Sequence, residues 1–156
     1  GDDAPVPAGG RGRIFVGNPM LFAGYTGGGS KPVVDGLMAT GDTGHFDRHG
    51  RLFVDGRDDD MIVSGGENVF PREVEDHLVA HPGVADACVI GVADPQWGQR
   101  LRAFVVAVDG AGVTAAELQD HVRGRLARYQ VPRDIVFVAE LPRNATGKVL
   151  RRQLRP

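Results

Sequence analysis

Two glycine-containing loops carry the residue types that could bind or activate a ligand. The first is Ser64-Gly65-Gly66-Glu67-Asn68, where two adjacent glycines leave room for a narrow organic chain to pass against bare backbone. The second is Pro142-Arg143-Asn144-Ala145-Thr146-Gly147-Lys148, whose lysine ammonium is a compact point charge that can reach a single phosphate oxygen. Both loops have the kind of backbone that can approach a phosphate or a thin organic chain closely. A plain hairpin turn is the competing interpretation of the first loop.

Lysine is rare in this chain, and that rarity makes the second loop more noticeable. Of the 18 basic residues, only Lys31 and Lys148 are lysines, and all the others are arginines. Arginine does not replace lysine where a mobile charge must reach one oxygen. Without its flanking residues, however, Lys148 is equally compatible with a surface lysine in a turn.

Two residues in the first half could contact a sugar. Asp42 lies in Thr40-Gly41-Asp42-Thr43-Gly44, and its carboxylate is expected to stand clear at the end of a strand. Such a carboxylate can accept hydrogen bonds from two neighbouring hydroxyl groups, as on a ribose. Arg57 follows Gly56 at another expected strand end. Taken alone, both residues are more typical of an ordinary turn and a solvated charge.

Other polar clusters are poorly spaced for a metal ion. Asp58-Asp59-Asp60 lacks the alternating ligands, central glycine and distal glutamate of an EF-hand. His77 and His81 have a zinc-compatible spacing on an expected helix, but no third ligand is convincingly placed. We therefore expect no metal site formed by this sequence alone. Trp97, in a short loop after Asp94, could stack on or cover a ligand, although packing is an equally good interpretation.

The elements that must position these residues differ between the two halves of the chain. Residues up to about 57 are expected to form short strands at 13–16, 37–42, 45–47 and 52–55, with a hairpin turn at 47–50 and a flexible break at 27–30. This stretch has too little apolar area for a confident stand-alone domain, so we expect it to be the end of a larger one.

The second half has the pattern of a compact α+β domain. Pro71 suits the first turn of a helix that ends near residue 81, with Val74 and Leu78 on its apolar face. Thr114 opens a second helix through a capping box, and that helix is expected to reach about residue 128. Strands are expected at 60–64, 87–92, 101–108 and 135–138. The order β-β-α-β-β-α-β predicts a short sheet covered by two helices.

Composition narrows the class of protein. The 156 residues suffice for one domain or a small domain with a fragment of another, and the chain begins at Gly1, which suggests a piece of a longer polypeptide. A formal charge of -2 gives no argument for nucleic acid or an anionic membrane. The apolar runs are too short for a transmembrane segment, and no leader sequence is recognisable. Cys88 is the only cysteine and is expected in the core, so a cytoplasmic location is the default.

Several segments, taken in chain order, resemble one enzyme family. They are Gly12-Arg13-Ile14-Phe15-Val16-Gly17, Gly24-Tyr25, Thr40-Gly41-Asp42, Gly56-Arg57, the run from Ile62 to Pro71, and Pro142 to Lys148. Together they are similar to the carboxyl-terminal part of the acyl-adenylate-forming (AMP-binding) enzymes, and most closely to acyl-CoA synthetases of the fatty-acid and aryl-CoA ligase type. The resemblance covers the chain from about residue 12 to residue 154.

The resemblance implies two domains. Residues 1–57 would be the β-rich end of a large N-terminal domain, and residues 58–156 would be a mobile C-terminal domain that swings about Asp59. Lys148 would be the lysine of the adenylation step, where its charge offsets the repulsion between a carboxylate and the α-phosphate of ATP.

Ligand contacts follow from the same resemblance. Asp42 and Arg57 would contact the ribose or phosphate of ATP or AMP. The acceptor CoA would run past Gly65-Gly66 and Trp97, with Tyr129 and Arg133 near its nucleotide. Mg²⁺ would accompany ATP, with its ligands mostly outside this sequence.

The activity implied for the parent protein is an ATP-dependent acyl-CoA ligase. It would convert a carboxylic acid, expected to be a fatty acid, into acyl-AMP and then acyl-CoA, and its partners would be the rest of its N-terminal domain, the acid and CoA. The segments that hold the ATP phosphates, the adenine and the acid are absent from this sequence, so the chain alone is expected to be inactive. Three alternatives remain open: an adenylation domain that loads a carrier protein, a luciferase-like oxygenase, and a non-catalytic interaction module.

Overall fold

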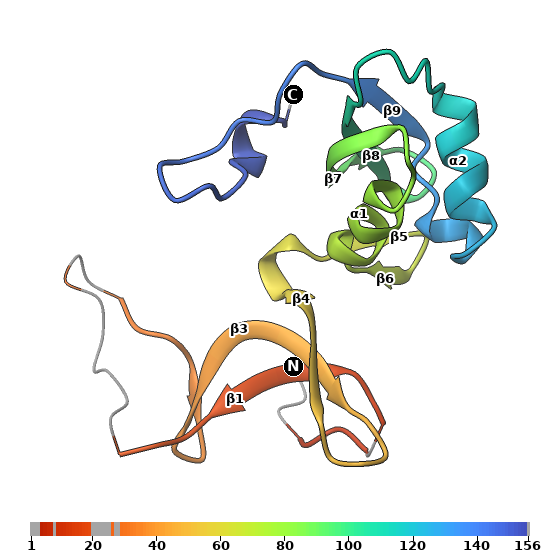
Figure 1. Cartoon of the computed structure of the whole chain (residues 1–156). Coiled ribbons are helices and arrows are strands. Elements are labelled where there is room, and N and C mark those ends of the chain that lie inside the picture. The colour runs from red at the N-terminus through yellow and green to blue at the C-terminus, as the bar shows by residue number, and fades with distance from the viewer. Residues whose placement is uncertain (1–3, 8, 20–25, 27–28, 156) are drawn as a thin grey trace. The chain divides into compact units, whose positions relative to one another are not determined.

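The computed structural model describes residues 4–7, 9–19, 26 and 29–155, and the chain forms two compact units (Figure 1). The first unit ends at Asp59 and the second begins at Asp60, two residues after the boundary expected from the resemblance. The Gly24-Tyr25 segment lies outside the described residues, as does part of the expected break at 27–30.

The first unit is a four-stranded antiparallel sheet. Its strands are β1 (Gly12–Val16), β2 (Val33–Val34), β3 (Leu37–Phe46) and β4 (Leu52–Arg57), and β3 pairs with each of the other three. The predicted turn is present between β3 and β4, where the Gly50 N–H donates to the Asp47 carbonyl oxygen at 3.0 Å.

One prediction for this unit is wrong. The two strands expected at 37–42 and 45–47 are a single strand, because a register shift at Thr43 and Gly44 lets β3 continue past its glycines. Gly44 is needed there, since a Cβ atom would lie 2.3 Å from the Phe53 carbonyl oxygen. Glycines in this strand therefore mark a bulge and a close approach of backbones rather than a break.

The core of the first unit is small. Met38 and Ala39 are the buried hydrophobic residues in its described part, whereas Phe46, Leu52 and Phe53 are each more than 40% exposed. This balance agrees with the expectation that the segment has too little apolar area to form a domain alone.

The second unit has the predicted α+β fold. A five-stranded sheet contains β5 (Ile62–Ser64), β6 (Glu67–Val69), β7 (Val84–Asp94), β8 (Gly98–Ala107) and β9 (Asp134–Phe137), in the order β6-β5-β8-β7, with β9 parallel to β8. The helices are α1 (Pro71–Val79) and α2 (Ala115–Arg123). The chain order β-β-α-β-β-α-β is the predicted one.

Both helices pack their predicted apolar residues on one face of the sheet. Val74 and Leu78 of α1 and Leu118 of α2 are fully buried against Val89 and Val105. The Thr114 capping box is present, with the Glu117 N–H donating to Thr114 Oγ1 at 3.3 Å. Helix α2 ends at Arg123, five residues earlier than predicted, because Gly124 occupies the C-cap.

The opposite face of the sheet has a cover that the sequence did not predict. Cys88, Ile90 and Phe104 form a second buried cluster there, closed by Leu141 with Val149 and Leu154 from the C-terminal segment. Burial on both faces explains why β7 reads as a continuous apolar run. In Figure 1 the C-terminal segment lies on the side of its domain away from α2.

Candidate functional site

Asp42 and Arg57 face each other across β3 and β4. They are direct partners in the strand register, and Arg57 Nη1 donates to Asp42 Oδ1 at 3.4 Å. Gly41 has a φ of +83°, and a Cβ atom there would come within 3.0 Å of Arg57 Nη2, so the glycine lets the guanidinium lie across the strand. Asp42 thus lies inside a strand and not at its end, and its carboxylate has a charged partner.

The rest of the Thr-Gly-Asp motif is held by internal hydrogen bonds. Thr40 Oγ1 donates to the Ile14 carbonyl oxygen and accepts from the Asp42 N–H, both at 3.0 Å. Lys31 Nζ donates to the Thr40 carbonyl oxygen at 2.5 Å. Because the threonine hydroxyl is engaged, Asp42, whose side chain is 32% exposed, is the group left to meet a ligand.

Asp59, the expected hinge, is the last residue of the first unit and belongs to a 3-10 turn (Asp58–Asp60). Its carboxylate accepts from Arg57 Nε at 3.1 Å, and this bond, together with Asp42, raises the pKa of Arg57. Asp58 is exposed, whereas Asp60 is partly buried and its carboxylate lies 3.5 Å from Arg151 Nε.

The lysine loop (residues 142–149) is organised by Asn144, a residue that the sequence did not single out. Asn144 Oδ1 accepts from the Lys148 N–H at 2.8 Å and from the Thr146 N–H at 3.1 Å, and Gly147 turns the chain at a φ of +81°. The base of the loop is tied to β7 by an ion pair between Arg143 and Asp86. The Lys148 side chain is exposed and has no hydrogen-bond or ion-pair partner among the described residues.

The C-terminal segment that follows the loop is anchored by Arg151. Its guanidinium pairs with Glu75 of α1 at 2.8 Å and donates to the Val89 carbonyl oxygen on β7 at 2.6 Å. Glu75 in turn accepts from the Val89 N–H at 2.7 Å. Burial opposes the charge of Arg151, but its bonds to Glu75 outweigh this and raise its pKa.

Gly65 and Gly66 form the two-residue turn between β5 and β6, so the hairpin interpretation is correct. Both have positive φ values, +62° and +86°, which side chains rarely adopt. Gly65 also has a specific neighbour: its N–H donates to the Trp97 carbonyl oxygen at 2.9 Å, and a Cβ atom would lie 2.7 Å from Trp97 Cε3. The turn and the close approach of another group are therefore both real, and that group is the indole of Trp97.

A groove of about 560 Å³ opens beside this contact and is called here the Trp97 groove. It is lined by the β5–β6 turn, Trp97, the start of β8, one side of α2 and the segment from Arg128 to Arg133. Arg133 lies over the Trp97 ring at 5.0 Å from its centroid, and Tyr129 is 42% exposed beside it. The structure thus brings together Gly65, Trp97, Tyr129 and Arg133, which are far apart in the sequence, whereas Gly66 does not line the groove.

The arginines that line the Trp97 groove differ in whether a carboxylate already pairs with them. Arg100 is paired with Asp94 and Asp134, and Arg123 is paired with Asp120. In the described part of the chain, Arg128 and Arg133 have no carboxylate within ion-pair distance. These two cations lack an ion-paired carboxylate and could meet an anionic ligand, with Arg133 already stacked on the Trp97 ring.

The remaining candidates have structural roles. Among the described residues, no group of three or more His, Cys, Asp or Glu side chains could hold a metal ion, and no helix is long and apolar enough to span a membrane. His81 packs edge-on against His121, which donates to the His77 carbonyl oxygen at 3.1 Å. Cys88 is buried, and burial raises the pKa of its thiol to about 12.

Comparison with known proteins gives the chain its relatives. The chain is 42% identical over 157 residues to the 2-succinylbenzoate–CoA ligase of Bacillus cereus (strain Q1). This match covers 99% of this chain and 32% of the relative. The o-succinylbenzoate CoA synthetase from Bacillus subtilis, solved with its acyl-adenylate intermediate, has a TM-score of 0.87 at 39% identity, over 96% of this chain and 31% of that one. An amide bond synthetase from Marinactinospora thermotolerans has a TM-score of 0.86 at 35% identity, over 98% and 32%.

The relatives are longer than this chain, and part of the chain matches a known domain family. The chain spans about a third of the length of the relatives it matches. Residues 73–148 match the family described as the AMP-binding enzyme C-terminal domain. Residues 73–148 thus carry the AMP-binding enzyme C-terminal domain, and the chain as a whole is similar to CoA ligases and CoA synthetases.

Proposed function

We propose that the protein of which this chain forms part is an ATP-dependent acid–thiol ligase that makes an acyl-AMP and transfers the acyl group to CoA. The observation that carries the proposal is the Trp97 groove, where a glycine backbone, an aromatic ring and two unpaired arginines converge. A thin thiol-bearing chain that ends in phosphates matches those three surfaces. The exposed Lys148 lies on a separate loop of the same domain.

In the first step, a carboxylate oxygen bonds to the α-phosphorus of ATP, and the bond to the bridging oxygen breaks to release pyrophosphate. Two anions approach each other, and the Lys148 ammonium offsets that repulsion in the transition state. At about 4 Å and an effective dielectric constant of about 20, one such charge contact is worth on the order of 10³-fold in rate. Mg²⁺ would accompany ATP, with its ligands mostly in the rest of the protein.

In the second step, the CoA thiolate bonds to the acyl carbonyl carbon, and the bond to the AMP phosphate oxygen breaks. The pantetheine arm would pass the Gly65 backbone and the Trp97 indole, and the phosphates would meet Arg128 and Arg133. The ribose or phosphate of AMP would meet Asp42 and Arg57 of the first unit.

The two steps use different surfaces of one domain, so the domain must turn between them. We propose residues 58–156 as the mobile domain and Asp59 as its hinge, in accord with the end of the first compact unit at that residue. Residues 1–57 would then be the end of the larger domain, which is the partner that completes the site.

The acid and the location belong to this proposal too. The fatty acid expected from the sequence gains no support from the relatives, the first of which is named for an aryl acid. We therefore propose a carboxylic acid and include aryl acids in every test. A cytoplasmic location is proposed on the single buried thiol of Cys88.

A different acceptor is the main alternative. The amide bond synthetase has nearly the same fold similarity as the CoA synthetase, so the fold itself does not fix the acceptor. An adenylation domain that loads a carrier protein would also keep Lys148. A non-catalytic module would not be expected to retain both Lys148 and the Asp42–Arg57 pair.

The test is pyrophosphate release by the full-length protein against a panel of fatty and aryl acids, with CoA, a carrier protein or an amine as acceptor. Release with one acid class, and thioester only with CoA, would support the proposal and name the acid. Pyrophosphate release with no CoA thioester would refute the CoA assignment. The 156-residue chain alone should release none.

A further inference from the structure

We propose that Asp94 is a positioning residue for the acceptor step, because it fixes the backbone from which the Trp97 indole extends against Gly65. This inference rests on the proposed function, since the step it serves is transfer to CoA. Asp94 was not among the residues singled out in the sequence, and its carboxylate does not line the Trp97 groove.

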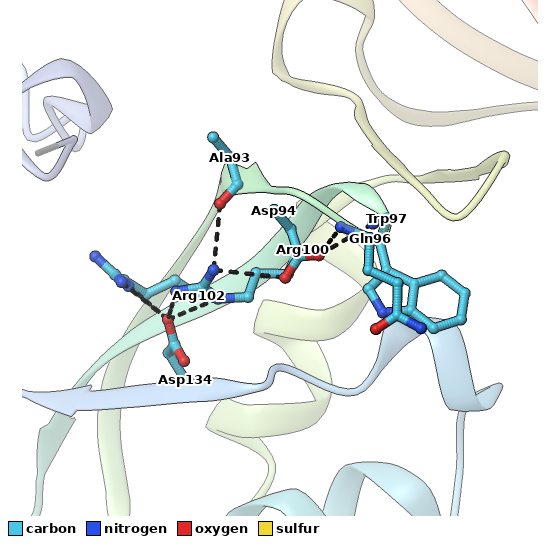
Figure 2. A network of polar contacts seen from close by, with 7 residues as sticks. All are labelled: Ala93, Asp94, Gln96, Trp97, Arg100, Arg102 and Asp134. Carbon is cyan, nitrogen blue, oxygen red and sulfur yellow. Dashed lines mark hydrogen bonds and ion pairs between the residues drawn. The ribbon is translucent and has the colours of Figure 1, made fainter.

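The Asp94 carboxylate holds the backbone of the Trp97 loop. Asp94 Oδ1 accepts from the Gln96 N–H at 2.9 Å and from the Trp97 N–H at 3.0 Å, as Figure 2 shows. On the other side of the same residue, the Trp97 carbonyl oxygen accepts from the Gly65 N–H at 2.9 Å. Both polar groups of the Trp97 backbone are therefore tied down, which fixes the point from which the indole extends toward the Gly65 turn.

A second layer holds the carboxylate itself. Arg100 Nη1 lies 3.5 Å from Asp94 Oδ2 and 3.2 Å from the Ala93 carbonyl oxygen, and Arg100 Nε donates to Asp134 Oδ2 at 3.1 Å. Arg102 donates to the same Asp134 oxygen at 3.0 Å. Two carboxylates and two guanidinium groups thus form a neutral network, and Arg100 is committed to it rather than to a ligand.

The environment keeps Asp94 ionised. Its side chain is only 10% exposed, and burial opposes the charge. The N–H groups of Gln96 and Trp97, helped by Arg133 and Arg100, nevertheless lower its pKa. A charged acceptor is the stronger holder of two N–H groups, so the loop is fixed at neutral pH.

The arrangement is suited to a ligand that slides past one face of the ring. Trp97 is 37% exposed, with Gly65 against one part of the ring and Arg133 stacked on it. The hydrogen bonds at the Trp97 N–H and carbonyl oxygen hold this part of the loop in place before the acceptor binds. Binding of the acceptor therefore costs less conformational entropy. Asp94 has no comparable link to the lysine loop, so adenylation should not depend on it.

The test compares Asp94→Ala with Trp97→Ala and with the double variant in the full-length protein. Pyrophosphate release without CoA reports adenylation, and thioester formation from supplied acyl-adenylate reports transfer. We expect Asp94→Ala to raise the KM for CoA and to lower the ratio of transfer to adenylation by about tenfold. In the Trp97→Ala background the same change should have almost no further effect on transfer, because Asp94 acts through that ring.

Two further variants keep the test decisive. Asp94→Asn retains an oxygen acceptor for the two N–H groups and a similar volume, so it should fold and lose less than Asp94→Ala. Asp76→Ala removes an exposed carboxylate that lies 3.9 Å from Arg72 Nε, and it should change neither step.

The outcomes separate this inference from the function on which it rests. If wild-type protein forms no thioester with CoA, the proposed function fails and the inference fails with it. If wild-type protein forms thioester but the Asp94→Ala and Trp97→Ala losses multiply, the positioning role is overturned and the function stands. Equal loss of adenylation and transfer in Asp94→Asn would reduce Asp94 to a residue that maintains the fold.

Discussion

The lysine loop and the Trp97 groove are built in opposite ways, although both belong to the second unit. The loop is largely local: Asn144 and Gly147 shape it, the Arg143–Asp86 pair ties its base to β7, and Val149 at its end packs on the sheet. The groove draws on a hairpin turn, a loop after β7, a helix and a later 3-10 turn. The loop presents the Lys148 ammonium, which has no ion-pair partner among the described residues. The groove presents the Trp97 ring, the Gly65 backbone and several arginines, of which Arg100 is already ion-paired.

This difference predicts which substitutions should affect adenylation and which should affect transfer to the acceptor. A change in the loop should act on one charge and leave the fold unaffected. A change in the groove can act at a distance, because Trp97 is placed by residues that a ligand never touches. The predictions below test this contrast, from the largest expected effect to the smallest.

Removing the Lys148 charge should have the largest effect. Lys148→Ala in the full-length protein should slow adenylation on the order of 10³-fold, because the repulsion between carboxylate and phosphate is no longer offset. Thioester formation from supplied acyl-adenylate should change far less. Arg152→Ala, at an exposed cation four residues later, is the matched control. Equal losses in both steps would remove the distinction between loop and groove.

Arg151 should matter for the whole domain rather than for either surface. Arg151→Met leaves the Glu75 carboxylate, only 15% exposed, without its charged partner, so the free energy of unfolding should fall by about 3 kcal/mol. Thermal unfolding of the full-length protein measures this, with Arg151→Lys expected to be milder. The ratio of adenylation to transfer should stay unchanged among the folded molecules. A selective loss of one step would instead assign Arg151 to that surface.

Gly65 and Gly66 offer a matched pair for the groove. Alanine at either position is strained by the positive φ, at a cost of about 1 kcal/mol. Only at Gly65 would the new Cβ meet Trp97, at 2.7 Å, whereas nothing lies within 4 Å at Gly66. Gly65→Ala should therefore lower transfer by about tenfold more than Gly66→Ala, with adenylation spared in both. Equal transfer rates in the two variants would mean that the turn alone matters.

His121 should give the smallest effect, and one that does not distinguish the two surfaces. Burial, followed by the charge of Arg125 and the nearby His81 and His77, lowers its pKa from the ordinary value of 6.5. The unfolded chain then binds a proton more readily than the folded one, so this contribution to stability is present above about pH 6.5 and is lost as the pH falls below it. Unfolding melts at pH 7.5 and 5.5 should show a smaller pH dependence in His121→Asn. An unchanged dependence would contradict the assignment.

Local patterns in the sequence predicted much of the fold. The capping box at Thr114, the first-turn Pro71 and the apolar spacing of Val74 and Leu78 all appear where they were expected. The two wrong predictions both concern the effect of a glycine on a strand or helix. A break was predicted after Asp42, but Gly41 and Gly44 instead let Arg57 and Phe53 approach the backbone of one continuous strand. The end of α2 was misplaced because Gly124 outweighed the apolar stripe that continues to Leu126.

The candidate site divides in the same way. The sequence alone determined the two glycine loops, the single lysine at the end of one of them and the chain order of the elements, because turns and caps depend on neighbouring residues. Only the tertiary structure decided that Trp97 packs on Gly65, that Arg100 is neutralised while Arg128 and Arg133 are not, and that Asp42 is paired with Arg57. These facts depend on contacts between residues far apart in the chain. Such contacts arise from burial and charge pairing in the folded state, which no local pattern records.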